Sequence, residues 1–244
     1  MNTLCLDFGN TLRKAAIFEN GELKVPIRLD GTGVDPIRRL IEKYKPVRSI
    51  LSSVIDHEID IETFLHQQTR FVKLSSKCNL PFTSGVGKPE TIGGDRLALC
   101  AAAVKIFPSA NRLIIGIGSC ITFNFINKYN VFLGGSISPG LGLRFKSLHD
   151  FTAHLPLVTE DWNYPLIGFD TRTNIINGVI LGMRLEIDGV IDEYARKFNN
   201  FNVLLTGGDG GYFARHLKNK IFADPHLIFK GLYTICEYND DTKI

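Results

Sequence analysis

The chain has 244 residues, a hydrophobic fraction of 44%, a charged fraction of 22% and a formal net charge of +3 at pH 7. This composition is typical of a globular protein and excludes a disordered chain, and the length suffices for one large domain or two small ones. The basic residues form no long run, so we expect no nucleic-acid partner. The apolar runs stay below the roughly 18 residues that a membrane span requires, so we expect no membrane association.

The N-terminus and the cysteines favour a cytoplasmic location. The first residues lack the basic region of a signal peptide. The cysteines are scattered, with no close pair of the kind found in zinc or redox sites, at Cys5, Cys78, Cys100, Cys120 and Cys236. Reduced thiols in a cytoplasmic protein are the simplest interpretation.

In chain order, the first half is predicted to open as an antiparallel meander. Short apolar runs separated by turn residues predict strands at 3–8, 13–18 and 22–27. Asp35 and Pro36 are typical of the first turn of a helix. The further expected elements are a strand at 49–54, a helix at 59–67, a strand at 71–74, a loop at 85–94 and a helix at 95–106.

The second half repeats the opening pattern. Strands are predicted at 112–117, at 121–126 and from residue 131, and the same order of strand, glycine turn, strand, turn and strand is shared by LCLDFGNTLRKAAIFENGEL and LIIGIGSCITFNFINKYNVF. Such a repeat indicates two copies of one structural unit. The later expected elements are a loop at 136–142, helices at 145–155, 173–198, 213–218 and 225–238, and a strand at 202–206.

The turn after the first strand is the first candidate site. The sequence Asp-Phe-Gly-Asn-Thr at 7–11 places a glycine where backbone can approach a phosphate, and successive N–H groups in such a turn bind anions. Asp7 is a candidate Mg²⁺ ligand, directly or through water. A plain turn in a hairpin is the alternative. The second copy, at 116–120, favours two turns that hold a triphosphate from both sides.

The second candidate site is Gly93-Gly94-Asp95-Arg96, just before an apolar helix. Asp95 is either the N-cap of that helix or a base that activates a hydroxyl group. The neighbouring Arg96 guanidinium suits the binding of an acidic substrate. The N-cap interpretation accounts for Asp95 but not for Arg96 or the paired glycines.

Three weaker signals remain open. The glycine-rich stretch 207–211 is either a flexible turn or a platform for a nucleoside, and it lacks the Lys-Ser/Thr of a Walker loop. Thr171 is either a helix N-cap or a substrate contact. Lys14 is either an exposed lysine or a phosphate contact.

These residues together resemble type III pantothenate kinases, which belong to the acetate kinase, sugar kinase and actin superfamily. The resemblance runs along nearly the whole chain. Its strongest pieces are the segments 7–11, 93–98 and 133–140, with 151–156 and 206–208 in support. It implies an α/β fold of two tandem actin-like (ribonuclease H-like) lobes, each a mixed sheet flanked by helices, with a nucleotide cleft between the lobes. We expect the lobes at 1–110 and 111–244.

The resemblance also implies an activity, the ATP-dependent phosphorylation of pantothenate in coenzyme A biosynthesis. Asp95 takes the position of the general base. The implied substrate contacts are Gly93, Gly94, Asp95, Arg96 and Thr171. The implied ATP contacts are Asp7, Phe8, Gly9, Asn10, Thr11, Leu12, Arg13, Lys14 and Ser119. Mg²⁺, a monovalent cation (K⁺ or NH₄⁺) and a homodimer are implied as well.

Three positions depart from the family pattern. Gly116 stands where the family places the aspartate that binds the monovalent cation, Asn124 where it often has aspartate, and Val86 where a tyrosine commonly contacts the substrate. Gly116 supplies no carboxylate, so we expect little dependence on K⁺. The departures leave two rival readings, a nucleotide-binding regulator without transfer activity and a kinase for another hydroxylated acid. A dinucleotide-binding oxidoreductase is disfavoured, because no Gly-x-Gly-x-x-Gly fingerprint follows the first strand.

Overall fold

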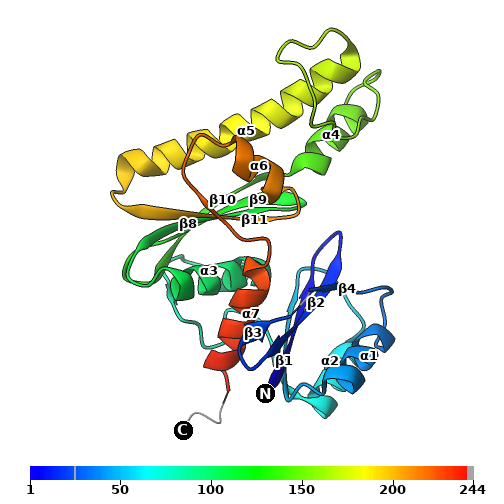
Figure 1. Cartoon of the computed structure of the whole chain (residues 1–244), viewed down its shortest axis with the longest axis vertical. Helices are drawn as coiled ribbons and strands as arrows, with labels where there is room; N and C mark the ends of the chain where they lie inside the picture. Colours follow the sequence, from blue (N-terminus) through cyan, green and yellow to red (C-terminus); the bar gives the residue numbers. More distant parts are fainter. Residues whose placement is uncertain (25, 241–244) are drawn as a thin grey trace. The chain divides into compact units, whose positions relative to one another are not determined.

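The computed structural model describes residues 1–24 and 26–240. The chain forms two compact units (Figure 1). The first unit contains Met1–Ser109, Ile126–Gly134 and His226–Ile244, and the second contains Ala110–Phe125 and Gly135–Pro225. The expected lobes at 1–110 and 111–244 stay a prediction. Within the described part of the chain, no helix combines the length and the apolar character needed to cross a membrane.

The first unit is built on a mixed sheet. Its strands are β1 (Asn2–Phe8), β2 (Arg13–Glu19), β3 (Glu22–Leu23), β4 (Ile27–Arg28), β5 (Arg48–Ser53) and β6 (Arg70–Lys73). They lie in the order β3-β2-β1-β5-β6, with β4 also paired to β2. The central strand β1 runs antiparallel to β2 and parallel to β5, so the carboxyl ends of β1 and β5 meet at one edge.

Helices α1 (Asp35–Tyr44) and α2 (Ile59–Gln68) provide apolar side chains for one face of this sheet. In α1, Pro36 occupies the first turn and the buried Ile37, Leu40 and Ile41 recur at the spacing of one helix face. They join the core formed by Leu4, Leu6, Phe8, Ala15, Ile17, Leu29, Leu51, Ile61 and Leu65.

Two further helices, α3 (Gly94–Ile106) and α7 (Leu227–Tyr238), pack against each other. A Cβ atom at Gly231 would overlap the backbone of Ala98, so this glycine sets how closely the helices approach. Helix α7 also packs on β1 and β5. Beyond its end, Asp240 pairs with Arg48 at 2.7 Å and with Arg70 at 2.9 Å, which ties the C-terminal segment to the first sheet.

The second unit contains the larger part of a second sheet. Its strands are β8 (Asn111–Ile117), β9 (Cys120–Ile126), β10 (Val131–Pro139), β11 (Phe201–Gly207) and β12 (Phe222–Ala223), in the order β12-β11-β8-β9-β10. Strands β9 and β10 are joined through 126–134, which belongs to the first unit. There the start of β10 pairs in parallel with β7 (Thr83–Ser84). The repeated order of strand, turn and strand in the two halves is confirmed.

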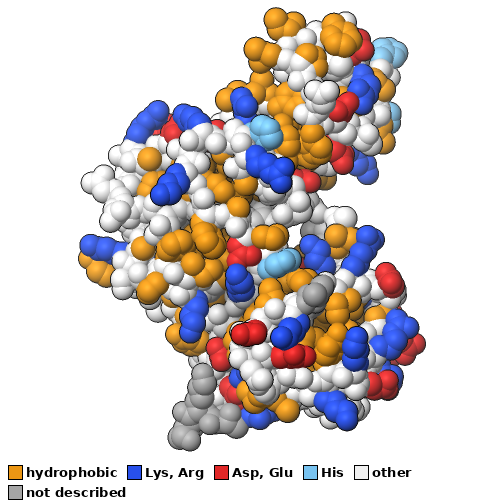
Figure 2. Space-filling model, in the orientation of Figure 1, with side chains coloured by type: hydrophobic (Ala, Val, Ile, Leu, Met, Phe, Trp, Pro, Cys, Tyr) orange, Lys and Arg blue, Asp and Glu red, His pale blue; other side chains and the backbone are white. Residues whose placement is uncertain are grey.

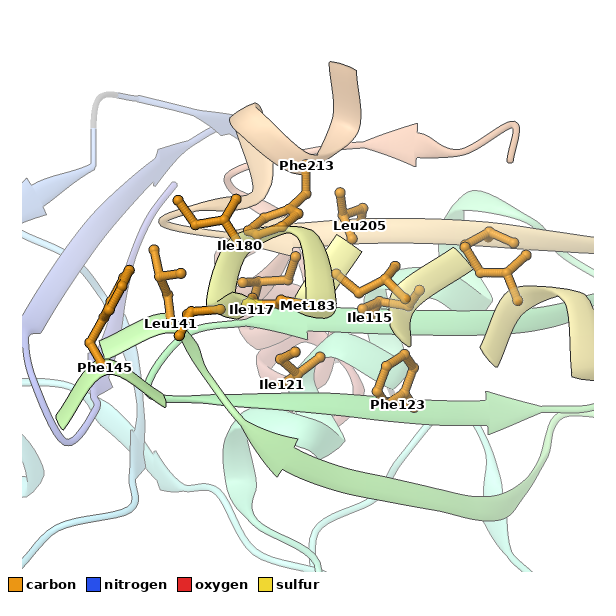
Figure 3. Close-up of a cluster of buried hydrophobic side chains, with 14 of the residues drawn as sticks. Ile115, Ile117, Ile121, Phe123, Leu141, Phe145, Ile180, Met183, Leu205 and Phe213 are labelled. Carbon is orange, nitrogen blue, oxygen red and sulfur yellow. The ribbon is translucent and has the colours of Figure 1, made fainter. Parts of the chain in front are cut away.

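Helices α4 (Leu141–Asp150), α5 (Thr171–Lys197) and α6 (Gly210–His216) share a core with the second sheet. Figure 3 shows Ile115, Ile117 and Phe123 from the strands beside Ile180 and Met183 of α5. The side chains that fill this core come from every other residue of β8 and β9, as expected for one face of a sheet.

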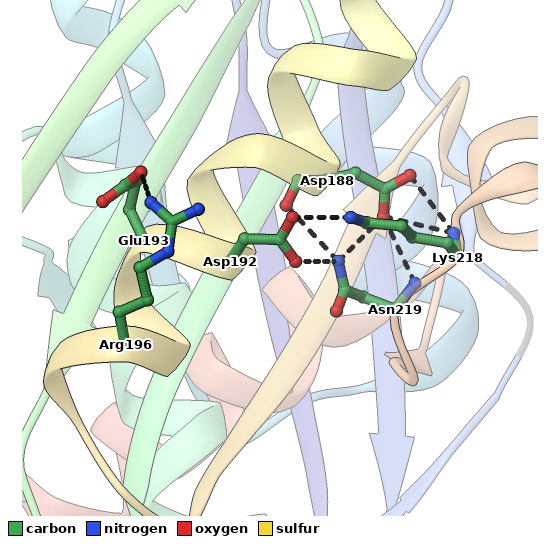
Figure 4. A network of polar contacts seen from close by, with 6 residues as sticks. All are labelled: Asp188, Asp192, Glu193, Arg196, Lys218 and Asn219. Atoms are coloured by element: carbon green, nitrogen blue, oxygen red, sulfur yellow. Dashed lines mark hydrogen bonds and ion pairs between the residues drawn. The ribbon is translucent and has the colours of Figure 1, made fainter.

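A polar cluster joins α5 to the loop after α6 (Figure 4). The buried Asp188 carboxylate accepts bonds from the backbone N–H groups of Lys218 and Asn219, both at 3.2 Å. Asp192 accepts a bond from Lys218 Nζ at 2.6 Å. Hydrogen bonds from Lys218 and Asn219 hold the pKa of Asp192 below its ordinary value.

Several predicted boundaries were wrong. The expected loop at 136–142 is the second half of β10, and α4 spans Leu141–Asp150 instead of 145–155. The glycines that suggested a loop serve close packing instead: a Cβ atom at Gly135 would overlap the backbone of Phe123 on β9. The expected strand 22–27 is divided into β3 and β4, and Val25 lies outside the described residues. The short helix expected at 213–218 is α6 at Gly210–His216.

Candidate active site

The turn that follows β1 is tight and closed by hydrogen bonds. The Gly9 N–H donates to the Leu12 carbonyl at 3.1 Å. Asp7 lies opposite Lys14, and Phe8 lies opposite Arg13, in the antiparallel register of β1 and β2. Asn10 and Thr11, at the tip, are exposed. The turn therefore presents backbone and short polar side chains to solvent, as a phosphate site requires.

Residues after β5 support this turn from behind. The Val54 N–H donates to the Phe8 carbonyl at 3.0 Å, and the His57 ring packs edge-on against Phe8 at 5.7 Å. The His57 Nε2 atom lies 2.8 Å from Glu62 Oε1. On the other side the Arg13 guanidinium lies over the Phe8 ring at 4.8 Å. Phe8 is thus a buried anchor of the turn.

Asp7 is a carboxylate near the end of β1 that is largely shielded from solvent. Burial, and to a smaller degree the nearby Asp95, raise the pKa of Asp7 to about 6, and Lys14 acts in the opposite direction. The register of β1 with β5 places Ser52 beside it on the neighbouring strand. The influence of Asp95 on this pKa means that the two carboxylates lie close enough within the first unit to interact electrostatically.

Asp95 lies in the first turn of α3. The N-cap position belongs to Gly93, and no side chain caps the helix. The alternative reading of Asp95 as an N-cap is therefore wrong, because its carboxylate makes no capping bond. An acidic side chain in the first turn interacts favourably with the helix dipole.

Arg96 and Val86 lie near the same strand, β10. The Arg96 guanidinium lies over the Phe132 ring at 5.8 Å. Val86 follows β7, and a Cβ atom at Gly134 would lie 3.6 Å from its Cγ1 atom. Because both partners belong to the segment 126–134, the first unit alone brings Arg96 and Val86 to adjacent parts of one strand.

The second turn, at 116–120, joins β8 to β9 in the second unit. The Gly118 N–H donates to the Cys120 carbonyl at 3.0 Å, and the Gly140 N–H donates to the Ser119 carbonyl at 3.0 Å. Gly207, at φ +112°, packs so closely on Ile117 that any Cβ atom would overlap its backbone. Gly207, the first residue of the stretch 207–211, therefore packs against the second turn. The reading of 207–211 as a nucleoside platform stays a prediction.

The two positions near this turn that depart from the family pattern are both internal to the sheet. Asn124 is fully buried, and its Nδ2 atom donates to the Ile114 carbonyl at 3.4 Å and to Thr122 Oγ1 at 3.3 Å. Gly116 pairs with Thr206 of β11. Gly116 has no side chain that could serve as a ligand, and the Asn124 amide donates to its own sheet.

Thr171 is the first residue of α5, and it lines a surface pocket of about 650 Å³ together with Arg144, Asn174 and Ile175. The reading of Thr171 as the N-cap is wrong. Asp170 holds that position, and its Oδ1 atom accepts a bond from the Thr173 N–H at 2.7 Å. Thr171 is exposed and does not cap the helix, so its hydroxyl lies at the surface of the pocket.

The first unit thus brings together the turn 7–14 and the segment 93–96, whereas Ser119 and Thr171 belong to the second unit. Sequence reasoning missed Ser52. Its only signal was a serine at the carboxyl end of a strand parallel to β1, where ligand-binding groups gather in α/β sheets.

The family model for type III pantothenate kinase matches residues 3–193. The chain belongs to the type III pantothenate kinase family. The kinase of that name from Christiangramia forsetii is 42% identical over 97% of this chain and 98% of its own length. The one from Phocaeicola vulgatus is 39% identical over 97% and 98%. The family resemblance seen in the sequence is confirmed.

Solved structures show the same fold at lower identity. A Baf family protein from Campylobacter jejuni superposes with a TM-score of 0.62 at 24% identity and covers 97% of this chain and 98% of its own. A glucokinase from an Antarctic psychrotroph gives a TM-score of 0.50 at 8% identity over 97% and 98%. Together with two mixed sheets flanked by helices, these likenesses confirm the actin-like fold class expected of a type III pantothenate kinase.

Proposed function

We propose that this chain transfers the γ-phosphoryl group of ATP to the primary hydroxyl group of pantothenate and forms 4'-phosphopantothenate, the first step of coenzyme A biosynthesis. The observation that carries the proposal is Asp95, a carboxylate in the first turn of α3 that makes no capping bond and that interacts electrostatically with Asp7. Membership of the type III pantothenate kinase family supports the same substrate pair.

In the proposed mechanism Asp95 accepts the proton of the pantothenate hydroxyl. The oxygen then forms a bond to the γ-phosphorus as the bond from that phosphorus to the bridging oxygen breaks, and ADP leaves with the electron pair. Such transfers depend mainly on positioning and electrostatics. In the first unit, the N–H groups of the turn 7–14 bind phosphate oxygens, and Lys14 adds positive charge. Arg96, Gly93 and Gly94 contact the acceptor.

Mg²⁺ fits Asp7. The carboxylate is largely buried at a strand end, and a pKa of about 6 leaves it mostly ionised at neutral pH. Oxygen ligands of this kind suit a hydrated Mg²⁺, which when bound offsets the negative charge of the phosphates. Asp7 would hold the ion directly or through water.

For the monovalent cation, unlike Mg²⁺, the chain lacks the expected carboxylate ligand. At the family's cation position Gly116 supplies no carboxylate, and no step of the proposed mechanism uses K⁺ or NH₄⁺. We expect product formation to change less than about threefold when K⁺ replaces a large organic cation, since no anionic ligand remains to bind it tightly. A strict requirement for K⁺ would contradict this.

The direct test is product formation from ATP, Mg²⁺ and pantothenate by the purified protein. Asp95→Asn keeps the shape of the side chain and removes the base, and we expect kcat to fall by about 10²- to 10⁴-fold. Asp35→Asn, an exposed acidic residue in the first turn of α1, is the matched control and should keep full activity. Full activity of Asp95→Asn would contradict the assignment of the base, and a wild-type protein that prefers another alcohol in an acceptor panel would contradict the substrate.

The assembly and the compartment are proposed on separate grounds. In the second unit, the segment between α4 and α5 exposes large apolar side chains, namely Phe151, Leu157, Leu166, Ile167 and Phe169. Figure 2 shows hydrophobic side chains gathered over this region. An exposed apolar group of this size is typical of an interface. We propose that it pairs two copies in a homodimer, and that the free cysteines reflect a cytoplasmic enzyme.

A further inference from the structure

Ser52 presents an unusual hydroxyl group. The residue is fully buried on β5, and its Oγ atom has no hydrogen-bond partner among the described residues. A buried hydroxyl without a partner costs free energy, so such a group in a native structure calls for an explanation. The other buried serine of this strand differs, because the Ser49 Oγ atom lies 2.6 Å from Thr69 Oγ1.

The Ser52 hydroxyl faces the start of α3. A Cβ atom at Gly94 would lie 2.9 Å from Ser52 Oγ, so the hydroxyl lies next to the first turn of the helix. The first N–H groups of a helix have no acceptor within the helix. In α3 the N-cap Gly93 has no side chain to accept them. An acceptor supplied by β5 would take the place of the missing cap.

Asp7 and Asp95, the two carboxylates of the proposed site, are neighbours of Ser52 and of Gly94, respectively. Ser52 is the register partner of Asp7 on the neighbouring parallel strand. Asp95 follows Gly94 in the chain, so any shift of the first turn of α3 moves its carboxylate. A group that fixes this turn therefore fixes the base relative to Asp7.

We propose that Ser52 is a positioning residue, whose hydroxyl accepts a hydrogen bond from a first-turn N–H group of α3 when nucleotide binds and thereby aligns Asp95. This inference rests on the proposed function for the role of Asp95. Because the first turn of α3 lies next to Ser52 Oγ, a small movement of the helix suffices to form the bond.

The kinetic test compares Ser52→Ala with Ser49→Ala. We expect Ser52→Ala to lower kcat about tenfold, with little change in KM for ATP, because one hydrogen bond to the turn is lost. Its melting temperature should not fall below the wild-type value, because the deleted hydroxyl has no partner in the free protein and its burial costs free energy. Ser49→Ala should show the reverse pattern, with a lower melting temperature and unchanged kcat. A wild-type kcat in Ser52→Ala, or a kcat loss that only accompanies a loss of stability like that of Ser49→Ala, would overturn the proposal.

A second measurement does not depend on the acceptor alcohol. Hydrogen exchange of the Gly94 and Asp95 amides is followed with Mg²⁺ and a non-hydrolysable ATP analogue. In the wild type the analogue should slow exchange at one of these amides by about tenfold, and in Ser52→Ala it should not. Equal slowing in both proteins, or no slowing in either, overturns the role of Ser52. If the wild type makes no phosphopantothenate, the proposed function fails while the exchange result still decides the role of Ser52.

Discussion

At the scale of single residues, Asp7 shows how a binding group can oppose folding. Its folded pKa of about 6 lies above the ordinary value of 3.8, mainly because burial disfavours the charged form. Between these two values the folded state binds more protons than the unfolded state, so the contribution of Asp7 to stability falls as the pH rises from about 4 to about 6. Above pH 6 the buried Asp7 carboxylate is ionised, and its burial lowers the free energy of unfolding by the full amount.

Asp7→Asn should therefore be more stable than the wild type at pH 7, by up to about 3 kcal/mol for a shift of about two pKa units. At pH 4 or below the advantage should vanish, because the wild-type carboxyl group is then protonated. Activity should be lost at both values. Urea unfolding of both proteins at pH 4 and pH 7 measures the difference, and a gain that is equal at the two pH values would contradict the argument.

Single residues also show what the sequence could reveal. The turn 7–14 and the segment 93–96 could be proposed as site segments because glycines and carboxylates at strand and helix ends form short, local patterns. Ser52 was missed, because a serine in an apolar strand looks the same whether its hydroxyl is bonded, as in Ser49, or faces a helix from a distant segment. Thr171 and Asp95 were ambiguous between cap and site until the caps were seen to be Asp170 and Gly93.

At the scale of elements, glycines decide how closely helices and strands approach. Local periodicity predicted most strands and helices to within a few residues, whereas β10 and α4 were misjudged. Their Gly-rich sequence reads as a loop, yet Gly135 and Gly140 serve contacts with the backbone of 118–124, which no local pattern can report. The α3–α7 contact at Gly231 is of the same kind.

Two glycines of the helices make a matched pair for a test. Gly231→Ala should destabilise the protein by about 1–3 kcal/mol, because the new methyl group overlaps the backbone of Ala98. Gly189→Ala in α5, where a Cβ atom meets nothing within 4 Å, should instead stabilise it by about 0.5–1 kcal/mol. Thermal and urea unfolding measure both. Equal effects of the two substitutions would mean that helix propensity alone decides, and the close-packing argument would fail.

At the scale of the whole molecule, the internal repeat predicted two similar sheets, and both are present. The sequence could not predict that the segments 126–134 and 226–244 belong with the N-terminal unit, because such pairing depends on contacts between residues far apart in the chain. The sequence also did not predict the apolar surface between α4 and α5. Which apolar side chains remain exposed depends on which of them the folded core buries.

This surface provides the test of assembly. Ile167 and Phe169 are 82% and 81% exposed, so changing both to Asp should not disturb a core, and it should convert the dimer to a monomer. Ile59→Asp is the control, because Ile59 is 70% exposed but lies on α2 in the first unit. Sedimentation analysis at micromolar concentration reports the mass. A wild-type monomer, or a double variant that remains dimeric, would contradict the proposed interface.

The salt bridges of Asp240 and the packing of α7 on β1 and β5 also bear on the order of synthesis. A ribosome that has released only the N-terminal half delivers the first sheet without the helix and the charge pairs that complete its unit. The apolar surface of β1 and β5 is then covered only after α7, which follows the second unit in the chain, has been translated. Completion of the first unit is thus coupled to translation of α7, and nascent chains halted before α7 would expose an apolar sheet face that chaperones bind.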